Sequence, residues 1–267
     1  MEIIAYAASA LIGISLGLVG GGGSIMTVPV LVYLFGTNPL LATSYSLFIV
    51  GSTSMVGAYH NYRKGLVSIN TALLFGSTSI STVFLTRKYI IPHIPKHIVQ
   101  LGSFELTAGI MTMVLFAILM VAAASAMISS GRKKEINEHT SLTKLNIPKL
   151  LGYGIAIGLA TGTLGAGGGF LLIPTLVLLV GLPMKEAVGT SLLIIALNSL
   201  IGFTGDLGHF DIEWAFLIKI TAIAIAGIFM GGALSKKIDD AKLKKGFGWF
   251  VLIMGVYIMT KELFLSK

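Results

Sequence analysis

The sequence predicts an all-α integral membrane protein made of two homologous halves. Three observations support this prediction: the composition, the length of the apolar segments and an internal repeat. Of the 267 residues, 55% are hydrophobic and 11% are charged, whereas a soluble domain carries ~25% charged residues to keep its surface wetted. Because the charges are too few for a soluble surface, we expect the lipid bilayer to surround most of the chain.

Apolar segments of the length of a membrane helix recur along the sequence. The segments Leu40–Tyr59, Leu66–Thr86 and Leu106–Ser129 contain no charged residue. A helix needs ~20 apolar residues to cross the hydrocarbon core of a bilayer. We therefore expect each of these segments to cross the membrane once.

The second half of the sequence repeats the first. When the sequence is shifted by 145 residues, Gly13–Gly57 falls on Gly158–Gly202 without a gap, and 16 of the 45 positions are identical. Apolar composition alone does not place glycines and a proline in the same register. The repeat predicts an N-terminal unit (residues 1–129), a polar, basic linker (residues 130–148) and a C-terminal unit (residues 149–267).

A run of glycines interrupts the first apolar element of each half. Ile3–Phe35 is interrupted by four glycines that begin at Gly20, and residues 149–180 are interrupted at Gly165. As one helix, Ile3–Phe35 would be ~50 Å long, whereas the hydrocarbon core is ~30 Å thick. Two interpretations compete: a tilted, broken helix that crosses the membrane, and a hairpin that enters and returns on one side.

The positions of the basic residues favour the hairpin, because cytoplasmic loops concentrate Lys and Arg. With hairpins, the 18 basic residues of loops and termini divide 13 to 5 between the two sides, and with crossing helices they divide nine to nine. Arg87 and Lys88 count here as loop residues of the poorer side. Each half then holds a hairpin and about three crossings, which predicts inverted repeats, a cytoplasmic linker and two outward-facing termini.

The two glycine runs are the predicted substrate site. Interrupted helices at matching positions of two halves mark the binding sites of many transporters, and helix N-termini bind anions through their backbone N–H groups. Hydroxyl and amide side chains nearby would add donors. The predicted substrate-binding residues are Gly20, Gly21, Gly22, Gly23 and Ser24 in the first run, Thr163, Gly165, Gly167, Gly168 and Gly169 in the second, and Ser44, Ser46, Thr190, Ser191 and Asn198 on the helices that follow.

Simpler explanations apply to part of this pattern. The pairs Gly13/Gly17 and Gly158/Gly162 have the spacing of small residues that allow helices to pack closely. Serine and threonine side chains in membrane helices often bond the backbone of their own helix. We therefore expect packing to explain these four glycines, and each hydroxyl taken singly has a structural alternative.

Two ionisable residues inside apolar segments, Lys219 and Glu105, are candidates for coupling or gating. Lys219 lies only one or two turns inside its segment, so its amine has the alternative of reaching the interface. A second group, Asp206, His209, Asp211 and Glu213, is interpreted as a solvated outer loop.

The residues give no sign of a catalytic or cofactor site. The chain has no cysteine, and Pro95 breaks the shared helical face that His93 and His97 would need to bind a metal. The glycine runs do not fit the nucleotide-binding motifs, and the basic residues lie in short loops, where they set membrane topology. We expect no enzymatic activity, no cofactor, no metal and no nucleic-acid partner.

The glycine pattern also carries a family resemblance. Residues 158–174 read G-x-x-x-G-x-x-G-x-G-G-G-x-x-x-x-P, and Ala187-Val188-Gly189-Thr190-Ser191-Leu192 follows; the first half repeats this with Gly20–Gly23, Pro29 and residues 42–47. This pattern resembles the sulfite exporter TauE/SafE family of membrane permeases. The resemblance implies a multi-pass inner-membrane permease for a small anion such as sulfite, a sulfonate or a related organosulfur anion.

The residues themselves leave three functions open. The first is a secondary permease for a small anion, and the second is a passive anion channel, which paired broken helices would suit equally well. The third is a membrane protein that transports nothing and serves as a partner of other proteins.

Overall fold

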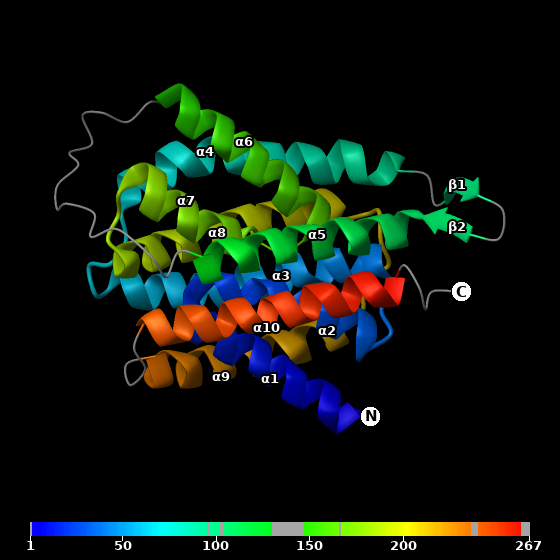
Figure 1. Ribbon diagram of the computed structural model, residues 1–267, viewed down its shortest axis with the longest axis horizontal. Helices are drawn as coiled ribbons and strands as arrows, with labels where there is room; N and C mark the ends of the chain where they lie inside the picture. The colour runs from blue at the N-terminus through cyan, green and yellow to red at the C-terminus, as the bar shows by residue number, and fades with distance from the viewer. Residues whose placement is uncertain are drawn as a thin grey trace.

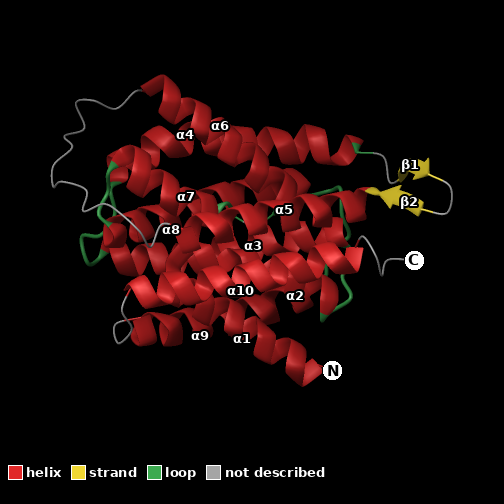
Figure 2. Cartoon of the chain, viewed as in Figure 1, coloured by secondary structure: helices red, strands yellow, loops and turns green. Residues whose placement is uncertain are grey.

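Helices make up almost all of the molecule. The computed structural model describes residues 2–94, 97–101, 104–129, 147–165, 167–235 and 240–262. Figure 2 shows this part of the chain as a bundle of helices with one small two-stranded hairpin at one end. The predicted all-α class is confirmed, and the hairpin is a minor addition to it.

The elements follow the order of the two halves. The first half contains α1 (Glu2–Val19), the glycine turn η1 (Gly20–Met26), α2 (Thr27–Tyr33), α3 (Pro39–Tyr62), α4 (Ile69–Leu85), η2 (Thr86–Ile90), η3 (Ile91–His93), the antiparallel strands β1 (His97–Leu101) and β2 (Phe104–Thr107), and α5 (Ala108–Ser129). The second half contains α6 (Ile147–Leu164), α7 (Gly169–Thr175), η5 (Leu176–Val180), α8 (Met184–Asp206), α9 (Trp214–Ser235) and α10 (Asp240–Thr260).

The predicted membrane segments form long helices. Four helical spans of the described chain are long and apolar enough to cross a membrane: Pro39–Tyr62, Ile69–His93, Lys185–Asp206 and Trp214–Leu234. The three segments predicted in the first half coincide with α3, α4 and α5. Local signals set the start of α3, where Pro39 occupies the first turn and the Asn38 side chain accepts a hydrogen bond from the Leu40 N–H at 3.0 Å.

The first glycine-interrupted element is a hairpin. The rings of Tyr6 in α1 and Phe35 just after α2 lie 6.2 Å apart between centroids. In one straight helix these residues would be ~43 Å apart at ~1.5 Å per residue. The Tyr33 hydroxyl at the end of α2 also donates to Glu262 at 2.8 Å, just beyond α10. The chain therefore enters and returns at the same end, and the hairpin prediction is confirmed.

The second interrupted element folds back in the same way. Figure 1 shows α6 starting, and η5 ending, at the end of the bundle opposite to the start of α1. The two hairpins thus open toward opposite ends. Most of the predicted linker, residues 130–146, lies outside the described residues.

Helix packing follows the internal repeat. The 145-residue shift carries α1 onto α6, α3 onto α8 and α4 onto α9, and α5 and α10 are the last helix of each half. The principal packed pairs are α1 with α9, α4 with α6, α3 with α8 and α5 with α10. The shift exchanges the first two pairs and returns the α3–α8 pair to itself, and in the fourth pair the last helices of the two halves pack on each other. The halves therefore pack on each other through matching surfaces.

Glycine contacts between helices are related by the repeat as well. Gly13 packs on the Ala224 carbonyl, and its repeat mate Gly158 packs on the Ser79 carbonyl; the shift converts 13 to 158 and 79 to 224. A Cβ at Gly13 or Gly158 would overlap these backbone atoms, and Gly17 meets α9 in the same way. These glycines serve close helix packing, as expected.

Two hydrogen bonds between the halves are also related by the repeat. The Ser68 N–H donates to Thr190 Oγ1 at 2.9 Å, and the Glu213 N–H donates to the Tyr45 hydroxyl at 2.8 Å. The shift converts 68 to 213 and 45 to 190. Each loop before α4 or α9 is thereby fixed to a helix of the other half. The inversion of the halves across a bilayer stays a prediction.

Candidate functional site

The tips of the two hairpins meet inside the bundle. Gly21 of the first turn and Gly169 at the start of α7 lie backbone against backbone, and a Cβ on Gly169 would overlap the Gly21 carbonyl. Gly20 packs on Val188 of α8, and its repeat mate Gly165 packs on Thr43 of α3. The two glycine runs are therefore one site in space, which we call the hairpin junction.

Glycine is required at this junction for its backbone conformation as well as for its size. Gly167 and Gly168 have φ of +66° and +68°, in the left-handed region that other residues rarely adopt. Gly168 precedes α7, and its carbonyl accepts hydrogen bonds from the N–H groups of Leu171 and Leu172, both at 3.0 Å. The second turn thus reverses the chain and starts a helix within a few residues.

Two matching helices form the wall beside the junction. A Cβ on Gly167 would lie 2.8 Å from Val50 Cγ1, 2.9 Å from Ile195 Cγ2 and 3.2 Å from Ser199 Oγ. Val50 on α3 and Ile195 on α8 are related by the repeat, because 50 plus 145 is 195. The junction therefore lies where the matching faces of α3 and α8 meet.

Polar side chains buried in the bundle lack partners. Among the described residues, the buried side-chain atoms without a hydrogen bond are Thr27 Oγ1, Ser44 Oγ, Ser46 Oγ, Ser54 Oγ, Arg87 Nε, Arg87 Nη2, Thr161 Oγ1, Asn198 Oδ1, Ser199 Oγ and Asp206 Oδ1. Eight of these ten atoms carry a hydrogen that can be donated, six of them hydroxyl oxygens that can also accept, and two are oxygens that only accept. Because buried polar groups are normally paired, this set of unpaired groups indicates a site for a polar ligand.

Some of the predicted residues belong to this set. Ser44 and Ser46 are fully buried and unpaired. Asn198 donates to Ser79 Oγ at 2.7 Å, which leaves its amide oxygen without a partner. The sequence interpretation did not single out Ser54 and Ser199, although these two serines are identical in the repeat.

Other predicted side chains have structural roles. Ser24 donates to the Gly21 carbonyl at 2.8 Å, and Ser191 donates to the Val188 carbonyl at 2.8 Å. Thr190 accepts the Ser68 N–H. Thr163 is partly exposed and donates to the Leu159 carbonyl of its own helix at 2.9 Å. The hydroxyl of Thr163 is therefore not among the unpaired buried donors.

The remaining glycines complete the first turn. Gly23 packs on the backbone of Ser15 and Leu16 in α1, where a Cβ would overlap their atoms. This contact closes the hairpin onto itself. Gly22 lies in the same turn, between Gly21 and Gly23.

Neither candidate coupling residue reaches the junction. Lys219 is exposed on α9. Glu105 lies in β2, before α5 begins, and Figure 1 shows this strand projecting from one end of the bundle. The placement of Lys219 favours the interfacial alternative.

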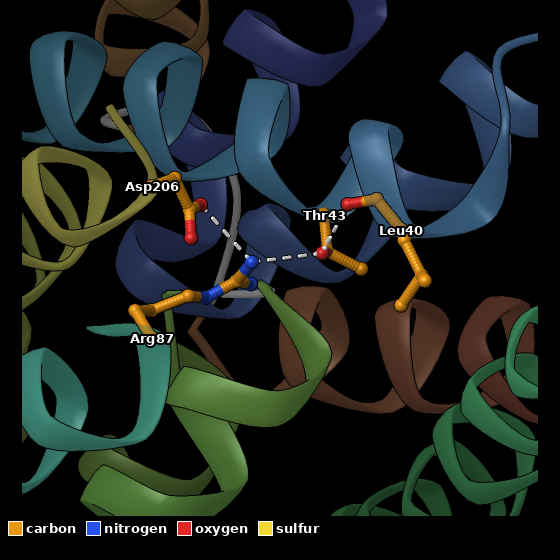
Figure 3. Close-up of polar contacts among 4 residues, drawn as sticks. All are labelled: Leu40, Thr43, Arg87 and Asp206. Atoms are coloured by element: carbon orange, nitrogen blue, oxygen red, sulfur yellow. Dashed lines mark hydrogen bonds and ion pairs between the residues drawn. The ribbon is translucent and has the colours of Figure 1, made fainter. Parts of the chain in front are cut away.

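A charged pair that was assigned to loops lies in the interior instead. Arg87 and Asp206 are 0% and 1% exposed, and Arg87 Nη1 donates to Asp206 Oδ2 at 3.1 Å. The same nitrogen donates to Thr43 Oγ1 at 3.0 Å, and Thr43 in turn donates to the Leu40 carbonyl at 2.7 Å. Figure 3 shows the guanidinium between the carboxylate and the hydroxyl. The interpretation of Arg87 as a loop residue, and of Asp206 as part of a solvated cluster, was wrong.

Arg87 and Asp206 lie in the interior because of where two helices end. The helix from Ile69 continues past Leu85 as the wider π-type turn η2 and carries Arg87 inward. Helix α8 extends to Asp206, so only the residues after it form the loop. Gly205 makes room, since a Cβ there would lie 3.1 Å from the Cβ of Arg87.

A bundle of apolar helices with a buried junction between two interrupted hairpins is the architecture of a multi-pass membrane transport protein. Residues 5–258 match the family Sulfite exporter TauE/SafE, and the chain belongs to this family.

Curated relatives carry matching descriptions. A probable membrane transporter protein of Xylella fastidiosa (strain Temecula1 / ATCC 700964) is 28% identical over 263 residues, covering 97% of this chain and 95% of the relative. One of Bacillus subtilis (strain 168) is 26% identical over 251 residues, covering 93% and 96%. One of Methanocaldococcus jannaschii is 35% identical over 129 residues, covering 46% and 48%. No solved structure matches the chain.

Proposed function

We propose that the chain is a secondary transporter of a small oxyanion, such as sulfite or a sulfonate, which binds at the hairpin junction. The observation that carries this proposal is the set of unpaired, buried hydrogen-bond donors in the bundle, which includes two nitrogens of the Arg87 guanidinium. An unpaired buried polar group costs ~1–3 kcal/mol, and a hydrogen bond to a charged acceptor contributes ~1.5–3 kcal/mol. An anion accepts hydrogen bonds from all of these donors, whereas a cation has only the lone pairs of the hydroxyl oxygens and is repelled by the guanidinium.

The arrangement of the halves supports transport over static binding. Each hairpin tip packs on the other tip and on the long helix of the other half. In our proposal residues 1–129 and 149–267 form inverted repeats, and rocking of one half against the other opens the junction to each side in turn. The family description names sulfite export, and the relatives are described as membrane transporters.

Binding selectivity tests the sign of the substrate charge. We expect sulfite and methanesulfonate to raise the thermal unfolding temperature of the purified protein, and amines or divalent metal cations to leave it unchanged. Ser199→Ala should weaken sulfite binding by about tenfold, which corresponds to ~1.4 kcal/mol for one lost hydrogen bond.

Ser77→Ala is the matched control, because Ser77 is exposed and donates to the Leu74 carbonyl of its own helix at 3.1 Å. This control should bind sulfite as the wild type does. A protein that cations stabilise and that no oxyanion stabilises would refute the proposed substrate class.

A further inference from the structure

Arg87 is a buried cation whose hydrogen-bonding capacity is only partly used. Its Nη1 serves both Asp206 and Thr43, whereas Nε and Nη2 have no partner. A guanidinium buried for structural reasons alone would be expected to have its donors paired. Ionisable groups inside a membrane protein mark functional sites by default. The unpaired donors of Arg87 therefore point to a ligand.

We infer that Arg87 binds the transported oxyanion through the edge of the guanidinium that carries Nε and Nη2, an assignment that rests on the proposed function. The N–H bonds of these two atoms run parallel on one side of the planar group. Such an edge matches two oxygens of one carboxylate, sulfonate or sulfite and binds them as a pair. A lysine ammonium lacks this shape.

Asp206 and Thr43 act as positioning residues in this arrangement. Both bind Nη1, so they fix the plane of the guanidinium from the side opposite to the free edge. Figure 3 shows these two contacts diverging from the same nitrogen. The Ser44 hydroxyl lies next to the Asp206 carboxyl group, where it can donate to the carboxylate and help to hold it in place.

Thr43 also connects Arg87 to the hairpin junction. Thr43 accepts a hydrogen bond from Arg87, and Gly165 packs on the backbone and the Cβ of Thr43. Gly165 begins the second glycine turn. Arg87 is therefore linked through Thr43 to the element that is proposed to move in transport.

The buried guanidinium occurs once per chain, because the internal repeat does not duplicate it. The positions that correspond to Arg87 and Asp206 are Gly232 and Asn61, because 87 plus 145 is 232 and 206 minus 145 is 61. The charged pair thus joins the halves at one end of the bundle and has no equivalent at the other. We expect one strongly bound oxyanion per chain, and a preference for oxyanions over a spherical halide.

Calorimetric titration of the full chain in lipid nanodiscs tests this assignment. The probes are sulfite, methanesulfonate and chloride, and the variants are Arg87→Lys and the control Arg63→Lys, whose arginine is exposed at the end of α3. We expect wild type to bind one oxyanion and to bind chloride at least tenfold more weakly. Arg87→Lys should weaken oxyanion binding by at least tenfold and remove the preference over chloride, and Arg63→Lys should change neither.

A double variant covers the case in which Arg87→Lys does not fold. Arg87→Met with Asp206→Leu removes both charges and keeps an apolar contact, a change that buried ion pairs often tolerate. It should insert and fold, yet bind no sulfite. If it or Arg87→Lys binds sulfite with wild-type affinity, the assignment of Arg87 is overturned and the proposed function stands. If wild type binds no oxyanion, both fall.

Discussion

Replacing Asp206 by alanine should destabilise the folded protein by about 3–5 kcal/mol, the usual effect of removing one partner of a buried ion pair. Arg87 is fully buried, and Asp206 is the anion that it contacts in the described chain. Without the carboxylate, the guanidinium keeps the single hydrogen bond to Thr43 that the structure shows. Reversible unfolding in mixed detergent micelles measures the change in the free energy of unfolding.

Two further variants make this result specific to the buried pair. Asp211→Ala removes an exposed carboxylate from the loop that follows α8, so it should change stability by less than ~0.5 kcal/mol. The double variant Arg87→Met with Asp206→Leu should recover most of the stability lost by Asp206→Ala, because no unpaired charge remains. Equal effects of Asp206→Ala and Asp211→Ala would show that the pair is not buried in the folded protein.

Replacing Gly167 by leucine should abolish transport. The left-handed backbone of Gly167 disfavours any side chain by ~1–2 kcal/mol. Its Cβ would also press on Val50, Ile195 and Ser199 at 2.8–3.2 Å, and extra volume in a packed interior costs ~1–3 kcal/mol. We expect the leucine side chain to fill the junction and to lower the transport rate more than 100-fold, which corresponds to ~3 kcal/mol.

Gly152→Leu is the matched control for this substitution. Gly152 lies in α6 of the same hairpin, and a Cβ there would meet no atom within 4 Å. Both variants should appear in the membrane fraction in similar amounts, and only Gly167→Leu should lose transport. Wild-type transport by Gly167→Leu would show that the glycine turn is not part of the substrate site.

The architecture was predictable because its signals are local or repeated. A charge-free segment such as Leu106–Ser129 has the length of a membrane helix whatever its neighbours are. The glycine runs indicate chain reversals, because four adjacent glycines disfavour a continuous helix. The division of basic residues between two sides then distinguished a hairpin from a crossing helix.

The chemistry of the site was less predictable, because it depends on contacts between distant residues. Arg87 and Asp206 are 119 positions apart. Each comes after an apolar segment, in a position that is equally typical of a loop residue. The turn η2 that carries Arg87 inward has no strong sequence signal. Ser54 and Ser199 did have one, since they are identical in the repeat, and Thr163 shows that nearness to a glycine run does not set the direction of a side chain.

Flux in reconstituted liposomes shows whether this chain carries a small oxyanion across a membrane. We expect the purified protein to catalyse uptake of radiolabelled sulfite that saturates with concentration and that methanesulfonate inhibits. Uptake that rises linearly without saturation would indicate a channel. Uptake no faster than in liposomes without protein would show that the chain does not transport sulfite.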